Sequence, residues 1–495
     1  MKKLLTLAWV LVMVSGTANA VPTEPPAATQ PNVIVLFADD LGYGDLGSFG
    51  HPYNRTPNID GLAAQGQRWT DFYVAAPVCS PSRGALMTGK LPVRTGLYGK
   101  NIAVYFPDEP GGMPASEVTL PEVLQKVGYR TGMFGKWHLG DAKHAWPTRH
   151  GFDEWLGLPY SNDMDWVNEP GIDELVAMRA QGKLAEVAAS LANRAPKYAD
   201  PKPEYWAPPL FKSLATADGY VDEELERPAE QSSLTRRYTE AAVDFMQRAD
   251  GQPFFVYLPY AMPHTPLFRS AEFVGKSLGG RYGDVIEEID WSVGTIKQAL
   301  LDLDLADNTL VIFSSDNGPW LTMRLEGGQA GLLRQGKGTT FEGGVRVPTV
   351  MWWPGKLRPG VISDIGSTLD VFTTVAALAG ADASSAVDGF DLSPVLFDGA
   401  DSAREEMAFY RGGALYAYRM GPWKAHLITE GAYGADPQRA EHSTPVLHHL
   451  LRDPSERFDV AADHPEVLAR IQLAIAAHQA DLVIKPPEFD KRLMP

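Results

Sequence analysis

The chain has 495 residues, with 44 Lys and Arg against 61 Asp and Glu, a formal net charge of −17, and 44% hydrophobic residues. This is a globular composition, and so acidic a chain is a poor candidate for binding nucleic acid or anionic lipid. A single cysteine, Cys79, excludes an internal disulfide framework and a zinc site of several thiolates. At about 100–200 residues per domain, the length fits two to four domains, or one large α/β unit with a smaller appendage.

The first twenty residues have the features of an export signal. Two lysines precede an apolar run over residues 4–14, and Ala18 and Ala20 supply the small side chains that a signal peptidase accepts. The run is short for a membrane span, and no cysteine follows it for lipid attachment, so we expect cleavage rather than a membrane anchor. Mature protein would begin near Val21. An export signal without a disulfide framework favours a bacterial periplasmic or secreted location, with lysosomal delivery as the alternative.

The mature chain alternates strand and helix patterns. Four short apolar runs are typical of strands buried on both faces: residues 32–37, 129–134, 254–258 and 309–313. Helical patterns precede the last three of these runs: residues 119–127 with Thr119 as the cap, 235–246, and 286–300 with one apolar stripe. The alternation predicts an α/β fold.

Two regions depart from this alternation. Residues 161–233 are rich in Pro, Ala and charge and show no clear strand, so we expect an excursion across the active face or, equally, a surface decoration. Trp166, Tyr205 and Trp206 lie in this region, and their pattern fits stacking on a sugar or aryl ring as well as ordinary packing.

The pattern changes again from Ala403. Three short strand candidates and a terminal helix over residues 465–482 predict a small antiparallel domain with one helix. We therefore expect three segments: an export signal over residues 1–20, a catalytic domain over residues 21–402, and a small α+β domain over residues 403–495.

Polar residues follow three of the predicted strands. Asp39 and Asp40 come after the first strand, His264 after the third, and Asp316 and Asn317 after the fourth. Ligands of open α/β sheets bind at the carboxyl ends of strands, so one site is expected to collect these side chains. The four Asp and Asn side chains offer oxygen ligands for a hard cation such as Ca²⁺ or Mg²⁺. Helix caps or solvated loop residues are the alternative interpretation of the same carboxylates.

The setting of the cysteine is specific. The segment reads Cys79-Ser-Pro-Ser-Arg83, followed by Leu86-Met-Thr-Gly89. This arrangement, Cys-x-Pro-Ser-Arg with Leu-x-Thr-Gly, resembles the signature of type I sulfatases, in which the cysteine is oxidised to formylglycine (3-oxoalanine). The resemblance implies hydrolysis of a sulfate ester by a formylglycine hydrate.

The resemblance extends from about Pro31 to about Pro394 and, more weakly, to the C-terminus. The segments that carry it read NVIVLFADDLGYGDLG from residue 32, GYRTGMFGKWH from residue 128, SSDNG from residue 314 and GKGTTFEGGVR from residue 336. One departure is Phe134, where a smaller residue is more usual. The set is most similar to the arylsulfatase A and N-acetylgalactosamine-6-sulfatase branch. Membership implies an alkaline phosphatase-like fold, with a large mixed sheet between helices and a small C-terminal antiparallel sheet.

The resemblance also implies a metal and a nucleophile. Ca²⁺, or less readily Mg²⁺, would be held by Asp39, Asp40, Asp316, Asn317 and the modified Cys79. The cation would orient the sulfate and favour the ionised diol oxygen, which attacks sulfur to give a covalent sulfate ester on residue 79 before inorganic sulfate is released.

Further roles are carried over from the family residue by residue. Asp316 would take a proton from the attacking hydroxyl, and His138 would deprotonate the second hydroxyl to release sulfate. The remaining residues would bind the reacting groups: Lys337 and His264 the sulfate and the leaving oxygen, Arg83 and Lys136 the diol oxygens, and Ser161 the sulfate. Glu342 and Arg346, in the last family segment, are expected to be structural.

Two other functions stay open at this point. One is hydrolysis of a phosphonate monoester or phosphodiester by a related formylglycine enzyme, and the other is a non-catalytic exported protein that binds sulfated glycans. The expected partners are a small-molecule or carbohydrate sulfate ester and a maturation enzyme that reads Cys79 to Arg83. We expect no nucleic-acid partner and no membrane anchor.

Overall fold

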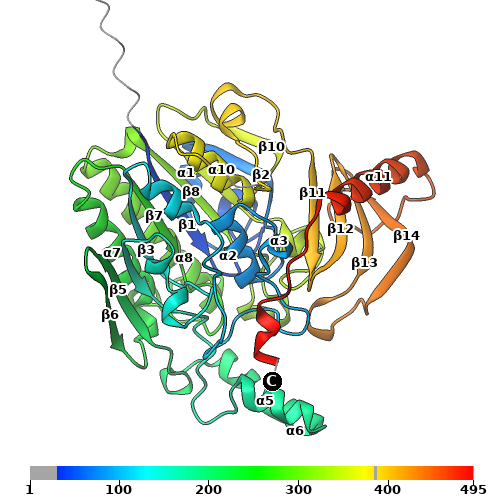
Figure 1. Cartoon of the computed structure of the whole chain (residues 1–495), viewed down its shortest axis with the longest axis horizontal. Helices are drawn as coiled ribbons and strands as arrows, with labels where there is room; N and C mark the ends of the chain where they lie inside the picture. The colour runs from blue at the N-terminus through cyan, green and yellow to red at the C-terminus, as the bar shows by residue number, and fades with distance from the viewer. Residues whose placement is uncertain (1–29, 384–386, 494–495) are drawn as a thin grey trace, which may run out of the picture.

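Two β-sheets organise the computed structural model, which describes residues 30–383 and 387–493 (Figure 1). The large sheet has ten strands in the order β10-β2-β9-β8-β1-β7-β3-β4-β5-β6, and the small one has four in the order β11-β12-β13-β14. A large mixed sheet with helices and a separate antiparallel sheet confirm the predicted fold class. The predicted export signal lies outside the described residues.

The core of the large sheet is parallel. β1 (Asn32–Ala38) lies between β7 (Phe254–Pro259) and β8 (Thr309–Ser315), and β3 (Arg130–Phe134) pairs with β7. All seven residues of β1 are buried, as the unbroken apolar run predicts. Four of the other six strands are β2 (Gln67–Tyr73), β4 (Glu154–Gly157), β9 (Thr349–Trp352) and β10 (Gly360–Ser367). β9 is antiparallel to both β2 and β8, so the sheet is mixed.

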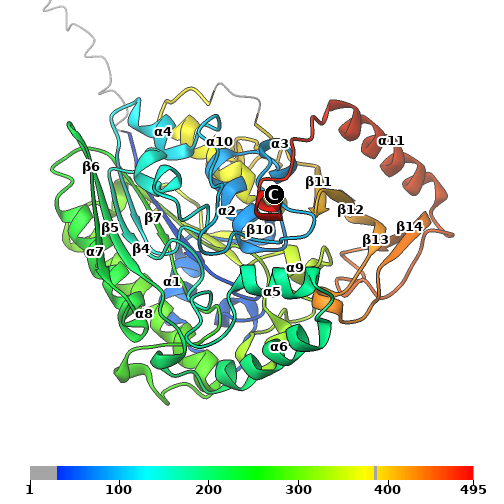
Figure 2. The ribbon, with the colours of Figure 1, turned by 60° about the horizontal axis from the view of Figure 1, so that its bottom comes forward.

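Helices cover both faces of this sheet, and the side chains of β1 alternate between two cores. Val33, Val35 and Phe37 belong to one core, whereas Ile34 and Leu36 belong to the other. On the first face lie α2 (Cys79–Thr88), α3 (Pro92–Thr95), α4 (Leu120–Gln125) and α10 (Thr368–Leu378). On the second lie α1 (Pro57–Gln65), α7 (Leu234–Gln247) and α8 (Gly280–Asp302) (Figure 2). Thr119 caps α4 in a capping box with Glu122, which confirms that predicted helix start.

The expectation that residues 161–233 contain no strand is wrong. After the helices α5 (Ile172–Ala180) and α6 (Leu184–Ala199), β5 (Leu210–Thr216) and β6 (Gly219–Glu226) form an antiparallel hairpin that extends the sheet at β4. β6 is the edge strand and carries four acidic residues, so it lacks the hydrophobic alternation that signals a strand. α5 and α6 lie together at the bottom of Figure 1, apart from this hairpin.

The C-terminal sheet contains the three predicted strands and one more. β11 (Glu406–Arg411), β12 (Ala414–Met420) and β13 (Trp423–Thr429) match the expected segments, and α11 (Pro465–Asp481) matches the terminal helix. β14 (Ala440–His449) was not expected, because it is a largely polar edge strand with Pro445 inside it. The boundary after residue 402 stays a prediction.

Buried ion pairs join the small sheet to the large one. Lys424 on β13 lies 2.8 Å from Glu342 Oε1 and 3.2 Å from Glu456 Oε1, and all three side chains are fully buried. Glu342 begins the short helix α9 (Glu342–Val345) and also accepts a hydrogen bond from the Tyr73 hydroxyl at 2.6 Å. Arg346 donates to the Thr70 carbonyl at 2.6 Å. These contacts support structural roles for Glu342 and Arg346. No helix of the described residues is long and apolar enough to cross a membrane.

Candidate active site

The predicted site lies at the carboxyl ends of three neighbouring strands. Asp39 directly follows β1 and Asp316 directly follows β8, while His264 comes five residues after β7. Since β1 lies between β7 and β8 and runs parallel to both, the three loops meet at one edge of the sheet. The Asp40 backbone, held at φ 64°, donates its N–H to Asp316 Oδ1 at 3.0 Å, and the Asp39 N–H donates to the Met262 carbonyl at 3.1 Å.

Cys79 begins α2 and points at this edge. Its Sγ lies 3.4 Å from Asp39 Oδ1 and 3.9 Å from Asp40 Oδ1, and the residue is 1% exposed. Arg83 lies four residues further along the helix, so both side chains lie on the same face. The Cys-x-x-x-Arg spacing therefore delivers a sulfur and a guanidinium to one cluster.

Three cations balance three carboxylates in the cluster. The Arg83 guanidinium contacts Asp316 Oδ2 at 2.8 Å, Lys136 Nζ contacts Asp39 Oδ2 at 2.5 Å, and Lys337 Nζ contacts Asp40 Oδ2 at 2.8 Å. All six side chains are at most 5% exposed. Burial of so many charges is tolerated because each has an opposite partner within hydrogen-bond distance.

Burial and these neighbours move the carboxyl groups in different directions. Burial alone raises the pKa of Asp39, but Lys136 and Arg83 outweigh it and hold that pKa well below the usual range. Burial raises the pKa of Asp40 to about 7 despite Lys337, and burial together with Asp39 raises the pKa of Asp316. A further positive charge bound at this site would therefore favour the ionised form of the Asp40 and Asp316 carboxyl groups.

The Cys79 thiol lacks the lowered pKa that is typical of a reactive cysteine. Burial, followed by the nearby Asp316 carboxylate, raises the pKa of its thiol well above the usual value. A thiolate is the nucleophilic form of cysteine, so the unmodified side chain is a poor nucleophile at neutral pH. Nucleophilic chemistry at this position would require a different functional group.

The side chains at this edge fit a divalent cation. Ligand atoms of Asp39, Asp40, Cys79 and Asp316 all lie within 4.8 Å of one another. Asn317 donates from Nδ2 to Asp40 Oδ1 at 2.7 Å, while its buried Oδ1 has no hydrogen-bond partner among the described residues. An unpartnered amide oxygen beside three carboxylates is the donor set that a hard cation such as Ca²⁺ or Mg²⁺ prefers.

The two predicted histidines lie in different surroundings. His264 Nδ1 lies 2.6 Å from the Thr265 carbonyl, so this nitrogen carries the proton, while Nε2 lies 3.7 Å from Asp40 Oδ2. Ser161 Oγ lies 3.3 Å from His264 Nδ1 and accepts from Lys136 Nζ at 3.3 Å, so Ser161 joins both residues to the cluster. Burial, and then Lys337, lowers the pKa of His264 well below its usual value.

His138 follows β3 and contacts the cluster less directly. Its Nε2 lies 2.9 Å from the Tyr105 carbonyl and therefore carries the proton, which leaves Nδ1, buried and unpartnered among the described residues, as an acceptor. Burial, and then Lys136, lowers the pKa of His138 well below its usual value. The structure thus brings ten of the predicted residues together by direct contacts. His138 is linked to them through Tyr105, whose N–H donates to the Ser80 hydroxyl beside Cys79.

Sequence reasoning missed Trp320. Its ring lies 4.5 Å from Lys337 Nζ and 5.1 Å from the His264 ring, and it also faces Tyr433 of the C-terminal sheet region at 5.8 Å. The signal available was its place three residues after Asn317, directly past a strand end. Trp206, by contrast, is fully buried and packs on Trp166 at 4.9 Å, which supports the packing interpretation of that pair.

Comparison with known families agrees with this geometry. Residues 31–381 match the family model described as Sulfatase, and residues 402–494 match the one described as the C-terminal region of aryl-sulfatase. The chain belongs to the sulfatase family.

Individual sulfatases are similar over nearly the whole length. Human arylsulfatase A is 39% identical over 496 residues, which cover 92% of this chain and 89% of the relative. Human N-acetylgalactosamine-6-sulfatase is 38% identical over 498 residues, covering 94% and 88%. The crystal structure of the PsFucS1 sulfatase from Pseudoalteromonas sp. superposes with a TM-score of 0.78 at 27% identity, covering 94% of this chain and 91% of that one. These relatives confirm the resemblance and the enzyme class, a sulfuric ester hydrolase.

Proposed function

We propose that this sulfatase hydrolyses sulfate esters of a sugar or an aryl alcohol with a nucleophile made from Cys79. The observation that carries the proposal is the placement of Cys79 Sγ 3.4 Å from Asp39 Oδ1, inside a buried cluster of three carboxylates and three cations. A thiol whose pKa is raised by burial is a poor nucleophile there, which argues for a different nucleophilic group at residue 79, namely formylglycine installed by a maturation enzyme. Hydrated formylglycine supplies one hydroxyl to attack sulfur and a second to expel the sulfate.

The cation required by the family would be held by Asp39, Asp40, Asp316, Asn317 and residue 79. Bound there, Ca²⁺, or less readily Mg²⁺, supplies charge neutralisation for the sulfate oxygens. The donor set supports this assignment because it consists of oxygens, with one amide oxygen left without a partner.

Lys337, His264 and Ser161 form the proposed sulfate-binding group, and Lys136 is proposed with Arg83 to bind the diol oxygens of residue 79. Ser161 Oγ lies 3.3 Å from both Lys136 Nζ and His264 Nδ1, so Ser161 joins the sulfate-binding group to the residues around the diol. Arg83 is engaged with Asp316 and Lys136, and orients the residue 79 end of the cluster. Positive groups placed before the reaction stabilise charge as it develops on the transferred sulfate.

Proton movements follow from the positions of the acids and bases. Asp316, whose pKa is raised by burial, accepts the proton of the attacking hydroxyl. His264 Nε2 and Lys337 Nζ both face Asp40 and are placed to donate to the leaving oxygen, and the incoming sulfate raises the pKa of His264 toward that task. His138 is neutral with an unpartnered Nδ1, the form that a base needs to take the second hydroxyl proton.

The substrate class, the export, the domain boundaries and the maturation of the protein are also proposed. A relative named for N-acetylgalactosamine-6-sulfate and another named for aryl sulfates support a carbohydrate or aryl sulfate as substrate. We propose export by the segment over residues 1–20 to the periplasm or the medium, a catalytic domain over residues 21–402, and a small α+β domain over residues 403–495. Formylglycine would be installed by a separate maturation enzyme that recognises Cys79 to Arg83.

The mass of the peptide that contains Cys79 tests this proposal. Protein from its own host should show a loss of about 18 Da at this residue, and protein made without a maturation enzyme should show an unmodified thiol. Aryl sulfate hydrolysis should follow the modified fraction, and Cys79→Ala should remove it. An unmodified thiol in fully active protein, or full activity in Cys79→Ala, would overturn the proposed mechanism.

A further inference from the structure

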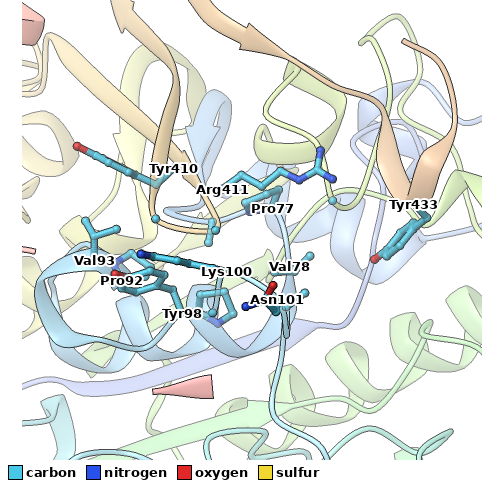
Figure 3. A pocket seen from close by; sticks show the side chains of 17 residues that line it. Pro77, Val78, Pro92, Val93, Tyr98, Lys100, Asn101, Tyr410, Arg411 and Tyr433 are labelled. Carbon is cyan, nitrogen blue, oxygen red and sulfur yellow. The ribbon is translucent and has the colours of Figure 1, made fainter. Parts of the chain in front are cut away.

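A cavity of about 240 Å³ lies between the catalytic part of the chain and the β11–β12 hairpin (Figure 3). One wall comes from residues 76–78 and 98–101 of the catalytic part, and the opposite wall from residues 410–413 of the hairpin with Tyr433 at the side. The volume is below the roughly 300–1,000 Å³ of pockets for drug-sized ligands, so it suits a single ring.

Two residues that line the cavity are chain neighbours of residues that carry the reacting groups. Val78 lines it and directly precedes Cys79, while Gly338 lines it and directly follows Lys337. The two segments are tied together by a hydrogen bond from the Gly338 N–H to the Pro77 carbonyl at 2.8 Å. The cavity therefore lies beside the two segments that present Cys79 and Lys337.

The charged side chains that line the cavity are all positive. Lys100 and Arg411 line the cavity with Asn101 and three tyrosines, and no acidic residue does, in a chain with a net charge of −17. Lys100 is exposed and has no side-chain partner among the described residues. Such a lining selects for a ligand that is negatively charged.

The Arg411 guanidinium is held through one of its nitrogens, and its other nitrogens remain available to a ligand. Its Nη1 donates to the Gly431 carbonyl at 3.2 Å and lies 3.4 Å from Glu430 Oε2, and Glu430 is itself engaged by the Tyr416 hydroxyl at 2.6 Å. Nε and Nη2 of Arg411 have no acceptor among the described residues. A guanidinium that is held through one nitrogen can bind a carboxylate or a sulfate with its remaining N–H groups.

Tyr433 completes the wall nearest the reacting groups. Its backbone lies in the left-handed region, at φ 51° and ψ 38°, which is uncommon for a tyrosine. Its ring lies 5.8 Å from that of Trp320, which contacts both Lys337 and His264. Tyr433 is the ring of the two that lines the cavity, and its apolar face suits packing against a sugar ring.

We propose that this cavity is the subsite for the leaving group and that it takes a sugar ring carrying a second anionic group, bound by Arg411 and Lys100. The inference rests on the proposed sulfatase function and adds the substrate class. The enzyme would then prefer a multiply charged sugar to a sugar whose only anionic group is the scissile sulfate.

Rates on three esters test the proposal with the matured full-length protein. The probes are nitrophenyl sulfate, N-acetylgalactosamine monosulfate and the corresponding disulfate. Wild type should have a kcat/KM for the disulfate at least about 10-fold above that for the monosulfate, the effect expected of one charge-assisted contact. In Arg411→Gln and Lys100→Gln the ratio of disulfate to monosulfate should fall toward one.

The control is Arg452→Gln, which removes an exposed arginine of the same domain outside the cavity. It should leave the ratio unchanged, whereas a fall as large as that of Arg411→Gln would show a non-specific charge effect and overturn the subsite. Equal wild-type rates on the two sugar esters, or an Arg411→Gln loss that is the same on all three probes, would also overturn it.

Binding separates this proposal from the proposed chemistry. The Cys79→Ala variant lacks the nucleophile, and its equilibrium binding of the disulfate depends on the cavity rather than on hydrolysis. Binding of the disulfate that weakens about 10-fold in Cys79→Ala/Arg411→Gln supports the subsite even where no ester is hydrolysed. Unchanged binding in that double variant overturns the subsite even where aryl sulfate hydrolysis establishes the sulfatase chemistry.

Discussion

Lys337 Nζ donates a hydrogen bond to Asp40 Oδ2 over 2.8 Å, although the two residues are 297 positions apart. The bond joins the proposed sulfate-binding group to the proposed metal ligands, and both side chains are almost fully buried. Burial raises the pKa of Asp40 to about 7 even with Lys337 present and with Asn317 Nδ2 donating to Asp40 Oδ1 at 2.7 Å. Lys337 is therefore required both for the charge balance of the site and for the anion it is proposed to bind.

Replacing Lys337 by Met should lower kcat/KM for nitrophenyl sulfate by about 10²–10³-fold, because one preorganised positive donor is lost from the sulfate. The substitution keeps the length of the side chain. The matched control is Lys126→Met, an exposed lysine after α4, which should retain wild-type kcat/KM. Folding is followed by circular dichroism, and a folded Lys337→Met protein with wild-type kcat/KM would contradict the assigned role.

Removal of the metal should abolish hydrolysis. Dialysis against a chelator should reduce activity together with bound metal, measured by elemental analysis, and Ca²⁺ should restore it more fully than Mg²⁺. Asn317→Ala removes the unpartnered amide oxygen, so the Ca²⁺ concentration for half-maximal recovery should rise at least about 10-fold. Asn193→Ala on the exposed face of α6 should leave that concentration unchanged. Full activity in metal-free protein would refute the metal assignment.

Lys424→Met tests the buried ion pairs between the two sheets. Lys424 holds the pKa of Glu456 at about 2 and that of Glu342 below its usual value, in both cases against the effect of burial. Without it two buried carboxylates lose their shared partner, so the free energy of unfolding should fall by about 3–5 kcal/mol. Lys491→Met, which breaks an exposed pair with Glu488, should cost less than about 1 kcal/mol. Denaturant unfolding measures both, and equal losses would contradict the prediction.

His150 should make the protein less stable in mild acid. Burial lowers the pKa of this histidine from 6.5 to about 4, and neither ring nitrogen has a hydrogen-bond partner among the described residues. Between these two pH values the unfolded chain binds a proton that the folded chain does not, so the contribution is complete above pH 6.5 and is lost as pH falls toward 4. The expected loss by pH 4.5 is on the order of 2 kcal/mol.

His150→Phe should remove that part of the pH dependence, because the phenyl ring keeps the packing against Trp137 without titrating. Denaturant midpoints at neutral pH and at about pH 4.5 compare the two proteins, and the variant should show the smaller difference. The same acid loss in His150→Phe as in wild type would contradict the assignment to His150.

Local sequence features determined the reacting end of the site. A buried strand followed by Asp39 and Asp40 predicts where those carboxylates lie, because the pattern depends only on a few neighbouring residues. The capping box at Thr119 was readable for the same reason. The helix that places Cys79 and Arg83 on one face was not predicted and came from the structure. The resemblance to sulfatases, carried by contiguous segments, added the roles that these residues are proposed to play.

The tertiary structure alone decided what depends on residues far apart in the chain. The edge strands β6 and β14 were missed because their solvated side chains leave no hydrophobic alternation, so only the neighbouring strand makes each of them a strand. The meeting of Trp320 with Tyr433 and the cavity lined by Arg411 depend on how the small sheet packs against the large one. A hydrophobic pattern reports which face of a segment is buried but not which distant segment buries it, and the leaving-group side of the site is built from such pairings.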